Sequence, residues 1–196
     1  MLRLNQSLTV LGFAGQDSGY VANCTVVGSA KFDMGSSADD VYLGTDSGMI
    51  STFFQSSVVI VPGSGADIAS VSQVQITHSL TIDDPTNATT VEVLGSHIGG
   101  NLFIFTSLAI DNVQIDSVTV VGLLKTILKD ANDKLNLTNV TANRMELFLG
   151  IGNDQVNATG LETQNLLVFL EDGADKSMVQ QSAITNSYYY GAGGND

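Results

Sequence analysis

The chain has 196 residues, of which 43% are hydrophobic and 14% are charged, and it carries a formal net charge of −13. Its seven Lys and Arg residues are too few to form the basic clusters that bind nucleic acid or an anionic membrane surface. A single cysteine excludes an internal disulfide, and no apolar stretch reaches the roughly 18 residues of a membrane span, so membrane insertion is not expected.

A turn that ends in an acid recurs along the chain at near-constant spacing. Short apolar runs lead into these turns, most of which contain glycine. The acids are Asp17, Asp39, Asp67, Asp111, Asp133, Asp154, Asp175 and Asp196, and Thr89 stands in the one position without an acid. Successive spacings are 22, 28, 22, 22, 22, 21, 21 and 21 residues. A fixed period of this size is typical of a solenoid, in which each repeat forms one coil.

Each repeat contains three segments in which apolar and polar residues alternate. In the repeat around Asp111 the apolar pairs are Leu102/Ile104, Val113/Ile115 and Val118/Val120. Alternation with a period of two predicts β-strands, so we expect three short strands per coil and an all-β fold. The simplest such fold is a parallel β-helix of about eight coils of 21–22 residues. We expect it to be right-handed, as parallel crossovers generally are.

The first residues already follow the pattern. Leu2 and Leu4 precede Cys24 and Val26 by 22 residues, so the chain begins within a coil, and it stops at the turn acid Asp196. We therefore expect residues 1–196 to be a single solenoid domain within a longer chain. The alternative is that copies stack end to end and so cover their open ends.

An insertion interrupts the regular spacing early in the chain. The interval from Asp39 to Asp67 is 28 residues instead of 22, and the six additional residues fall within residues 44–57. Insertions in solenoids form loops at one corner, and such loops often carry binding sites. We expect the simpler outcome, a longer loop with Phe53 and Phe54 packed over the core, and keep a binding loop as the alternative.

The segment 123–135 (LLKTILKDANDKL) has the strongest helical composition, yet it follows the same period as its neighbours and is predicted to be strand–turn–strand. It contains Lys125, Lys129 and Lys134, and Arg144 follows in the next repeat, near Asp130 and Asp133. Carboxylates beside basic residues are typical of polysaccharide-acting sites. A solvated, salt-bridged surface explains the same residues, and we do not expect an enzyme.

The later turn acids are candidate metal ligands. Stacked coils place them in a column with a spacing of about 4.8 Å, and calcium prefers carboxylate and carbonyl oxygens. The candidate calcium ligands are Asp133, Asp154, Asp175 and Asp196. Alternatively, each Asp accepts hydrogen bonds from turn N–H groups.

The glycine–aspartate turns at 63–67 (GSGAD), 150–154 (GIGND) and 191–196 (GAGGND) resemble those of RTX-type haemolysin repeats, which bind calcium in a parallel β-roll. That motif is a nonapeptide, whereas here one turn occurs in each 21–22 residues. Residues 147–156 (LFLGIGNDQV) are more similar to the repeats of large secreted or surface proteins of bacteria, planctomycetes among them. This resemblance implies a β-solenoid that is extracellular or at the bacterial cell surface.

A second column consists of apolar residues at a position that should face solvent. Its members are Phe105, Ile127, Phe148, Phe169 and Tyr190. An exposed apolar stripe of this length usually marks a partner surface, for a lateral neighbour of the same kind or for a glycan. The alternative is that the column lies at a corner and is partly buried.

Together these features favour a structural function. We expect a segment of an extracellular rod, such as a stalk, an adhesin shaft or a filament subunit, that self-associates end to end or laterally. The second hypothesis is a calcium-stabilised module that binds a glycan or a protein, and the third is a polysaccharide lyase or hydrolase.

Overall fold

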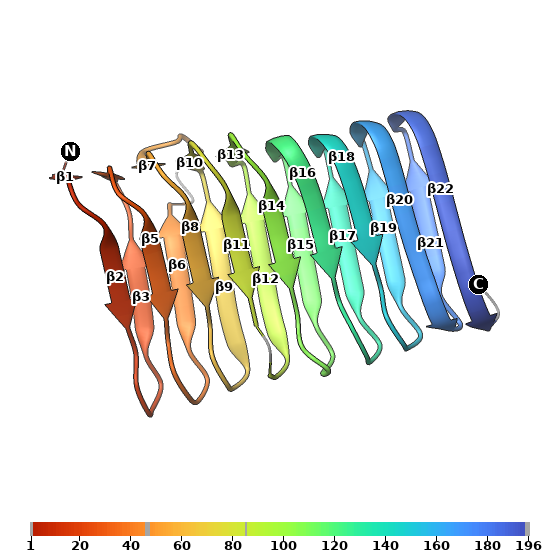
Figure 1. The fold of residues 1–196 in the computed structure, drawn as a ribbon, viewed down its shortest axis with the longest axis horizontal. Helices are drawn as coiled ribbons and strands as arrows, with labels where there is room; N and C mark the ends of the chain where they lie inside the picture. Colours follow the sequence, from red (N-terminus) through yellow and green to blue (C-terminus); the bar gives the residue numbers. More distant parts are fainter. Residues whose placement is uncertain (1, 46–47, 85, 195–196) are drawn as a thin grey trace.

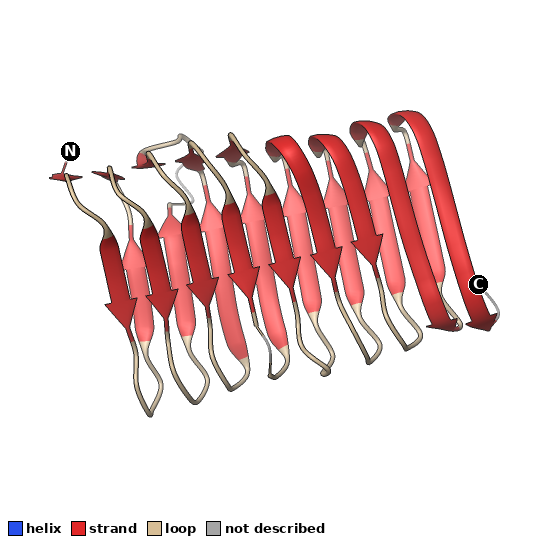
Figure 2. Cartoon of the chain, viewed as in Figure 1, coloured by secondary structure: helices blue, strands red, loops and turns tan. Residues whose placement is uncertain are grey.

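The structure is a computed structural model and describes residues 2–45, 48–84 and 86–194. Over these residues the strands pair in parallel and stack as successive coils of a β-solenoid (Figure 1). The same residues contain no helix, and hence none long and apolar enough to cross a membrane (Figure 2). The predicted all-β parallel β-helix is therefore confirmed.

Two β-sheets run along the molecule, and the described residues give the large sheet 14 strands and the small sheet eight. The first five coils each contribute two strands to the large sheet: β1 (Leu2–Leu4) and β2 (Leu8–Leu11), β4 (Cys24–Val26) and β5 (Ala30–Asp33), β7 (Thr52–Phe54) and β8 (Val58–Val61), β10 (Val74–Ile76) and β11 (Leu80–Asp83), and β13 (His97–Ile98) and β14 (Leu102–Phe105). The small sheet consists of β3 (Ser18–Val21), β6 (Asp40–Gly44), β9 (Asp67–Ser72), β12 (Thr89–Leu94), β15 (Asn112–Asp116), β17 (Lys134–Thr138), β19 (Gln155–Thr159) and β21 (Lys176–Gln180).

In the later coils one long strand replaces the two short strands of the large sheet. These long strands are β16 (Thr119–Ile127), β18 (Thr141–Phe148), β20 (Glu162–Gly173) and β22 (Ala183–Gly194). The predicted three short strands are separate in the first five coils and partly fused in the later ones, and the about eight predicted coils correspond to nine strand levels in the described part of the large sheet.

The corner within the fused strands becomes one residue shorter after β16. Val120 and Leu124 of β16 pair with Ala142 and Met145 of β18, so the later coil has one residue fewer between the paired positions. This is the residue lost when the period changes from 22 to 21. The strand then runs through the corner, and β16 accommodates its additional residue as a bulge between Val120 and Leu123.

The core lies between the two sheets and consists of columns of apolar side chains. One fully buried column of the large sheet is Phe32, Ile60, Ile82, Ile104, Thr126, Leu147 and Val168. It is opposed by a column of the small sheet formed by Val41, Ala69, Val91, Val113, Leu135 and Val156. Branched side chains pack well on a pleated surface, which accounts for the strand-forming composition of each coil.

The corner between the small sheet and the next strand of the large sheet is formed by one residue with left-handed backbone geometry. The φ angles of these residues lie between 47° and 69°, and the residues are Asn23, Gln73, Gly95, Ser117, Asn139, Gly160 and Gln181. Only glycine adopts this conformation without a penalty, and asparagine tolerates it better than most residues. The left-handed geometry of this corner therefore explains why Asn and Gly recur at this position of the repeat.

The inserted residues lie at the same corner. β6 ends at Gly44 and β7 begins at Thr52, so residues 45–51 connect strands that in the first coil are joined by Ala22 and Asn23 alone. Phe53 and Phe54 belong to β7 rather than to the loop. Phe54 is fully buried in the core, and Phe53 lies half-buried on the outer face.

Candidate functional site

A ladder of aspartates runs along the corner that precedes the small sheet. In the described residues it consists of Asp17, Asp39, Asp67, Asp111, Asp133, Asp154 and Asp175, and all except Asp17 are buried. At most levels the backbone N–H at this position donates to the carboxylate Oδ1 of the following coil; the exception is Asp67, whose N–H donates to the Ala88 carbonyl oxygen at 3.2 Å. The N···O distance is 2.8 Å from Asp111 to Asp133, 2.7 Å from Asp133 to Asp154 and 2.8 Å from Asp154 to Asp175. Each carboxylate therefore fixes the turn of the coil before it.

The second carboxylate oxygen is less well satisfied. Oδ2 is buried and accepts no hydrogen bond from a described residue in Asp39, Asp67, Asp133 and Asp154. Burial raises the pKa of Asp133 to about 7; the N–H of Asp111 offsets part of this rise, and the neighbouring carboxylates add to it. Burial likewise raises the pKa of Asp154 to about 6. Part of the ladder is therefore protonated near neutral pH.

Asp84 is a further buried acid beside the ladder, at the one level where the periodic acid is missing. Thr89 occupies that level, and its N–H donates to Oδ1 of Asp111 at 2.6 Å. The Asp84 side chain is fully buried, and its carboxylate lies close enough to Asp67 and Asp111 for both to raise its pKa, which burial brings to about 6. Its Oδ1 accepts the N–H of Thr86 at 3.1 Å. This residue was not predicted from the sequence, although a polar Asp84 five residues before the acid-free Thr89 was a signal.

Of the four predicted calcium ligands, Asp133, Asp154 and Asp175 lie on consecutive levels of the ladder, while Asp196 lies outside the described residues. The carboxylates of Asp154 and Asp175 accept backbone N–H groups, as the hydrogen-bonding alternative requires. Calcium needs six to eight oxygens around one centre. Among the residues that the structure describes, no three or more His, Cys, Asp or Glu side chains are placed to hold a metal ion.

The apolar column forms an aromatic stack on the outer face of the large sheet. The rings of Phe148 and Phe169 lie 4.4 Å apart with an interplanar angle of 2°, and those of Phe169 and Tyr190 lie 4.8 Å apart at 10°. Phe105 and Ile127 continue the column in register and are half-buried, as are both stacked Phe residues. The ring faces therefore contact one another, and the stack presents ring edges to solvent. Edges are a poorer platform for a sugar ring than open faces.

The basic residues of this region are distributed over both sheets. Lys125 and Arg144 lie on the large sheet, where both pair with Glu146 at 3.7 Å and 2.6 Å. Lys134 begins β17 in the small sheet, and the side chain of Asp133 is buried in the ladder. The strand–turn–strand prediction for residues 123–135 is confirmed, because β16 ends at Ile127 and β17 begins at Lys134. Lys125 and Arg144 thus lie on a different sheet from Lys134.

Comparisons of the chain with protein-family models, with curated proteins and with solved structures found no match.

Proposed function

We propose that this chain is a rigid structural rod segment of an extracellular or bacterial cell-surface protein. The observation that carries this proposal is the continuity of the two sheets. The small sheet runs unbroken from β3 to β21, and the large sheet runs from β2 to β22 without a gap in pairing. A parallel ladder of this kind resists bending, because every level would have to lose hydrogen bonds or core contacts at once.

Two further features support the proposal. The aspartate ladder adds one hydrogen bond between successive coils along the corner, and the stack of Phe148, Phe169 and Tyr190 adds a second outer contact. The extracellular setting rests on the resemblance of residues 147–156 to secreted and surface repeats. The net charge of −13 favours a solvated shaft that does not adhere to nucleic acid.

The stiffness of the solenoid can be tested by measuring the distance between two spin labels attached to it. Thr9 and Tyr188 are exposed and stand in one column, eight strand steps apart, which corresponds to about 38 Å between backbones. The labels are introduced as Thr9→Cys and Tyr188→Cys, while Cys24 is buried and protected from labelling. A single narrow distribution supports a rod. A broad or bimodal distribution contradicts it.

The location is tested separately on intact cells of the source organism. Antibodies against the segment should label the cell surface without permeabilisation, and external protease should remove the signal. Labelling that appears only after permeabilisation would contradict the extracellular part of the proposal and leave the stiffness result unaffected.

A further inference from the structure

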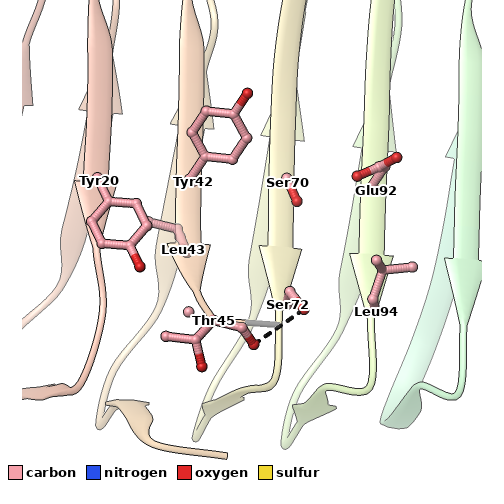
Figure 3. A pocket seen from close by; sticks show the side chains of 9 residues that line it. Tyr20, Tyr42, Leu43, Thr45, Ser70, Ser72, Glu92 and Leu94 are labelled. Carbon is pink, nitrogen blue, oxygen red and sulfur yellow. Dashed lines mark hydrogen bonds between the residues drawn. The ribbon is translucent and has the colours of Figure 1, made fainter. Parts of the chain in front are cut away.

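A hollow with a volume of about 310 Å³ lies on the outer face of the small sheet over the first four coils. The small residues Gly44, Ser70 and Ser72 are among its lining residues, and Thr45 lies beside Ser72 near the end of β6 (Figure 3). The tyrosines Tyr20 and Tyr42 stand on one side, and Glu92 and Leu94 stand on the other. From β6 to β12 is two strand steps, about 10 Å, which is wide enough for one sugar ring.

The hollow exists because side-chain size changes along one outward column. Tyr20, Tyr42, Ser70 and Glu92 are partners in adjacent strands, so two large rings are followed by a small hydroxyl and then by a carboxylate. Gly44 deepens the same region. A Cβ there would come within 1.7 Å of the Ser72 carbonyl oxygen, so no larger residue fits at this position.

We propose that this hollow binds a neutral saccharide, with one pyranose ring over Tyr42 and its hydroxyls on Ser70 and Glu92. In Figure 3 the rings of Tyr20 and Tyr42 are seen face-on over their strands, with their hydroxyls directed apart. These rings therefore differ from the Phe148–Phe169 stack, whose faces are covered. An open aromatic face suits the C–H face of a sugar, and neighbouring hydroxyls and a carboxylate suit its hydroxyl groups.

The charge of the hollow selects against acidic sugars. Glu92 is its single ionisable carboxylate, and among its described lining residues there is no Lys, Arg or His. A uronate or sialate would meet Glu92 and the nearby Asp40 without a compensating cation. Burial, Asp40 and Glu92 all raise the pKa of Tyr42, so its hydroxyl remains a hydrogen-bond donor at neutral pH.

This inference is independent of the rod function, because a stiff shaft with or without a saccharide site gives the same spin-label distances. The test is amide chemical-shift mapping of the whole chain with cellobiose, maltose, lactose and chitobiose, each at up to about 10 mM, the range of weak binding. Glucuronic acid and choline serve as the anionic and cationic probes. We expect at least one neutral disaccharide to shift the amides of Ser70 and Glu92, and both charged probes to bind more weakly.

Variants locate the site. Tyr42→Ala and Glu92→Gln should each weaken binding by about three- to tenfold, the size of one aromatic or charged contact. Ser70→Phe should abolish binding by filling the hollow. Tyr188→Ala, which removes an exposed tyrosine from the other sheet, should leave it unchanged. All four positions are outside the core, and unchanged thermal melting confirms that each variant folds.

Three outcomes would overturn the proposal. The first is that none of the four disaccharides shifts the Ser70 and Glu92 amides. The second is that binding persists at full strength in Ser70→Phe, which would place it elsewhere. The third is that choline or glucuronic acid binds more tightly than every neutral disaccharide, which would assign the hollow to a charged ligand.

Discussion

The carboxylate of Asp154 accepts the backbone N–H of Asp133 over 2.7 Å, although the two residues are 21 positions apart. The same contact recurs along the corner except at Asp67, so most turns are completed by an acid that belongs to the next coil. One carboxylate per repeat thereby both fixes the turn of the preceding coil and joins two stacked coils.

The ladder predicts that the protein becomes less stable as the pH rises from about 4 to about 8. The pKa values of Asp133, Asp154 and Asp84 are raised to about 7, about 6 and about 6, so the folded state holds protons that the unfolded state releases. The stabilisation is fully present below the ordinary pKa near 3.9 and is lost as pH passes the raised values. Thermal melting across this range measures the effect, on the order of several kcal/mol for the three groups together. A melting temperature that climbs with pH would contradict it.

At pH 8, Asp133→Asn and Asp133→Ala should have different effects on the free energy of unfolding. Asn retains the oxygen that accepts the N–H of Asp111 and removes a buried charge, so we expect equal or greater stability. Ala leaves that buried N–H without its acceptor and should cost about 1–3 kcal/mol. Urea unfolding of both variants measures this difference. Equal destabilisation by both would show that the charge itself is needed.

Asp84 and Thr89 should be energetically coupled. Thr89→Asp alone places another carboxylate beside Asp84 and should destabilise the protein. Asp84→Leu introduces the residue type found at the equivalent buried positions Leu128 and Leu149. In the Asp84→Leu background, Thr89→Asp restores the regular ladder, so the double variant should recover stability. A double-mutant cycle should give a coupling of about 1–3 kcal/mol, and simple additivity would contradict this account of Asp84.

Ser117→Gly should stabilise the protein by up to about 1 kcal/mol. Ser117 has a φ of 56° at a corner where Gly95 and Gly160 occupy equivalent positions, and left-handed geometry costs a non-glycine residue about that much. Thermal melting provides the measurement. The matched control is Thr119→Gly on the following strand, where glycine should destabilise.

Chelation should leave the melting temperature unchanged. The ladder carboxylates are held by N–H groups, so their order does not require a divalent ion. Melting is compared with excess EDTA and with added calcium. A drop with EDTA that calcium alone reverses would favour the calcium-stabilised module instead.

Much of the fold was predictable because stacking forces like residues into columns. The spacing of the acids and the alternation around Asp111 were sufficient to define the coils, the core and the ladder. The change from 22 to 21 residues showed that one residue was lost. It did not show which corner lost it, because apolar alternation continues on both sides of Ala142 and Met145.

The sites were less predictable than the fold. Asp84 is out of phase with the turn acids, and only its burial between Asp67 and Asp111 reveals its role. Tyr20, Tyr42 and Ser70 could be aligned in one column from their spacing. The hollow depends on how the tyrosine rings rotate over the strands, which periodicity does not determine.

The direction of the ladder has a consequence for how such proteins evolve. The carboxylate of one coil accepts the N–H of the preceding coil. A coil that carries its own acid can therefore be deleted or duplicated as a unit, and the same hydrogen bond forms across the new junction. Unequal recombination can therefore lengthen or shorten the solenoid without compensating substitutions. The length of the solenoid can then change independently of its surface residues.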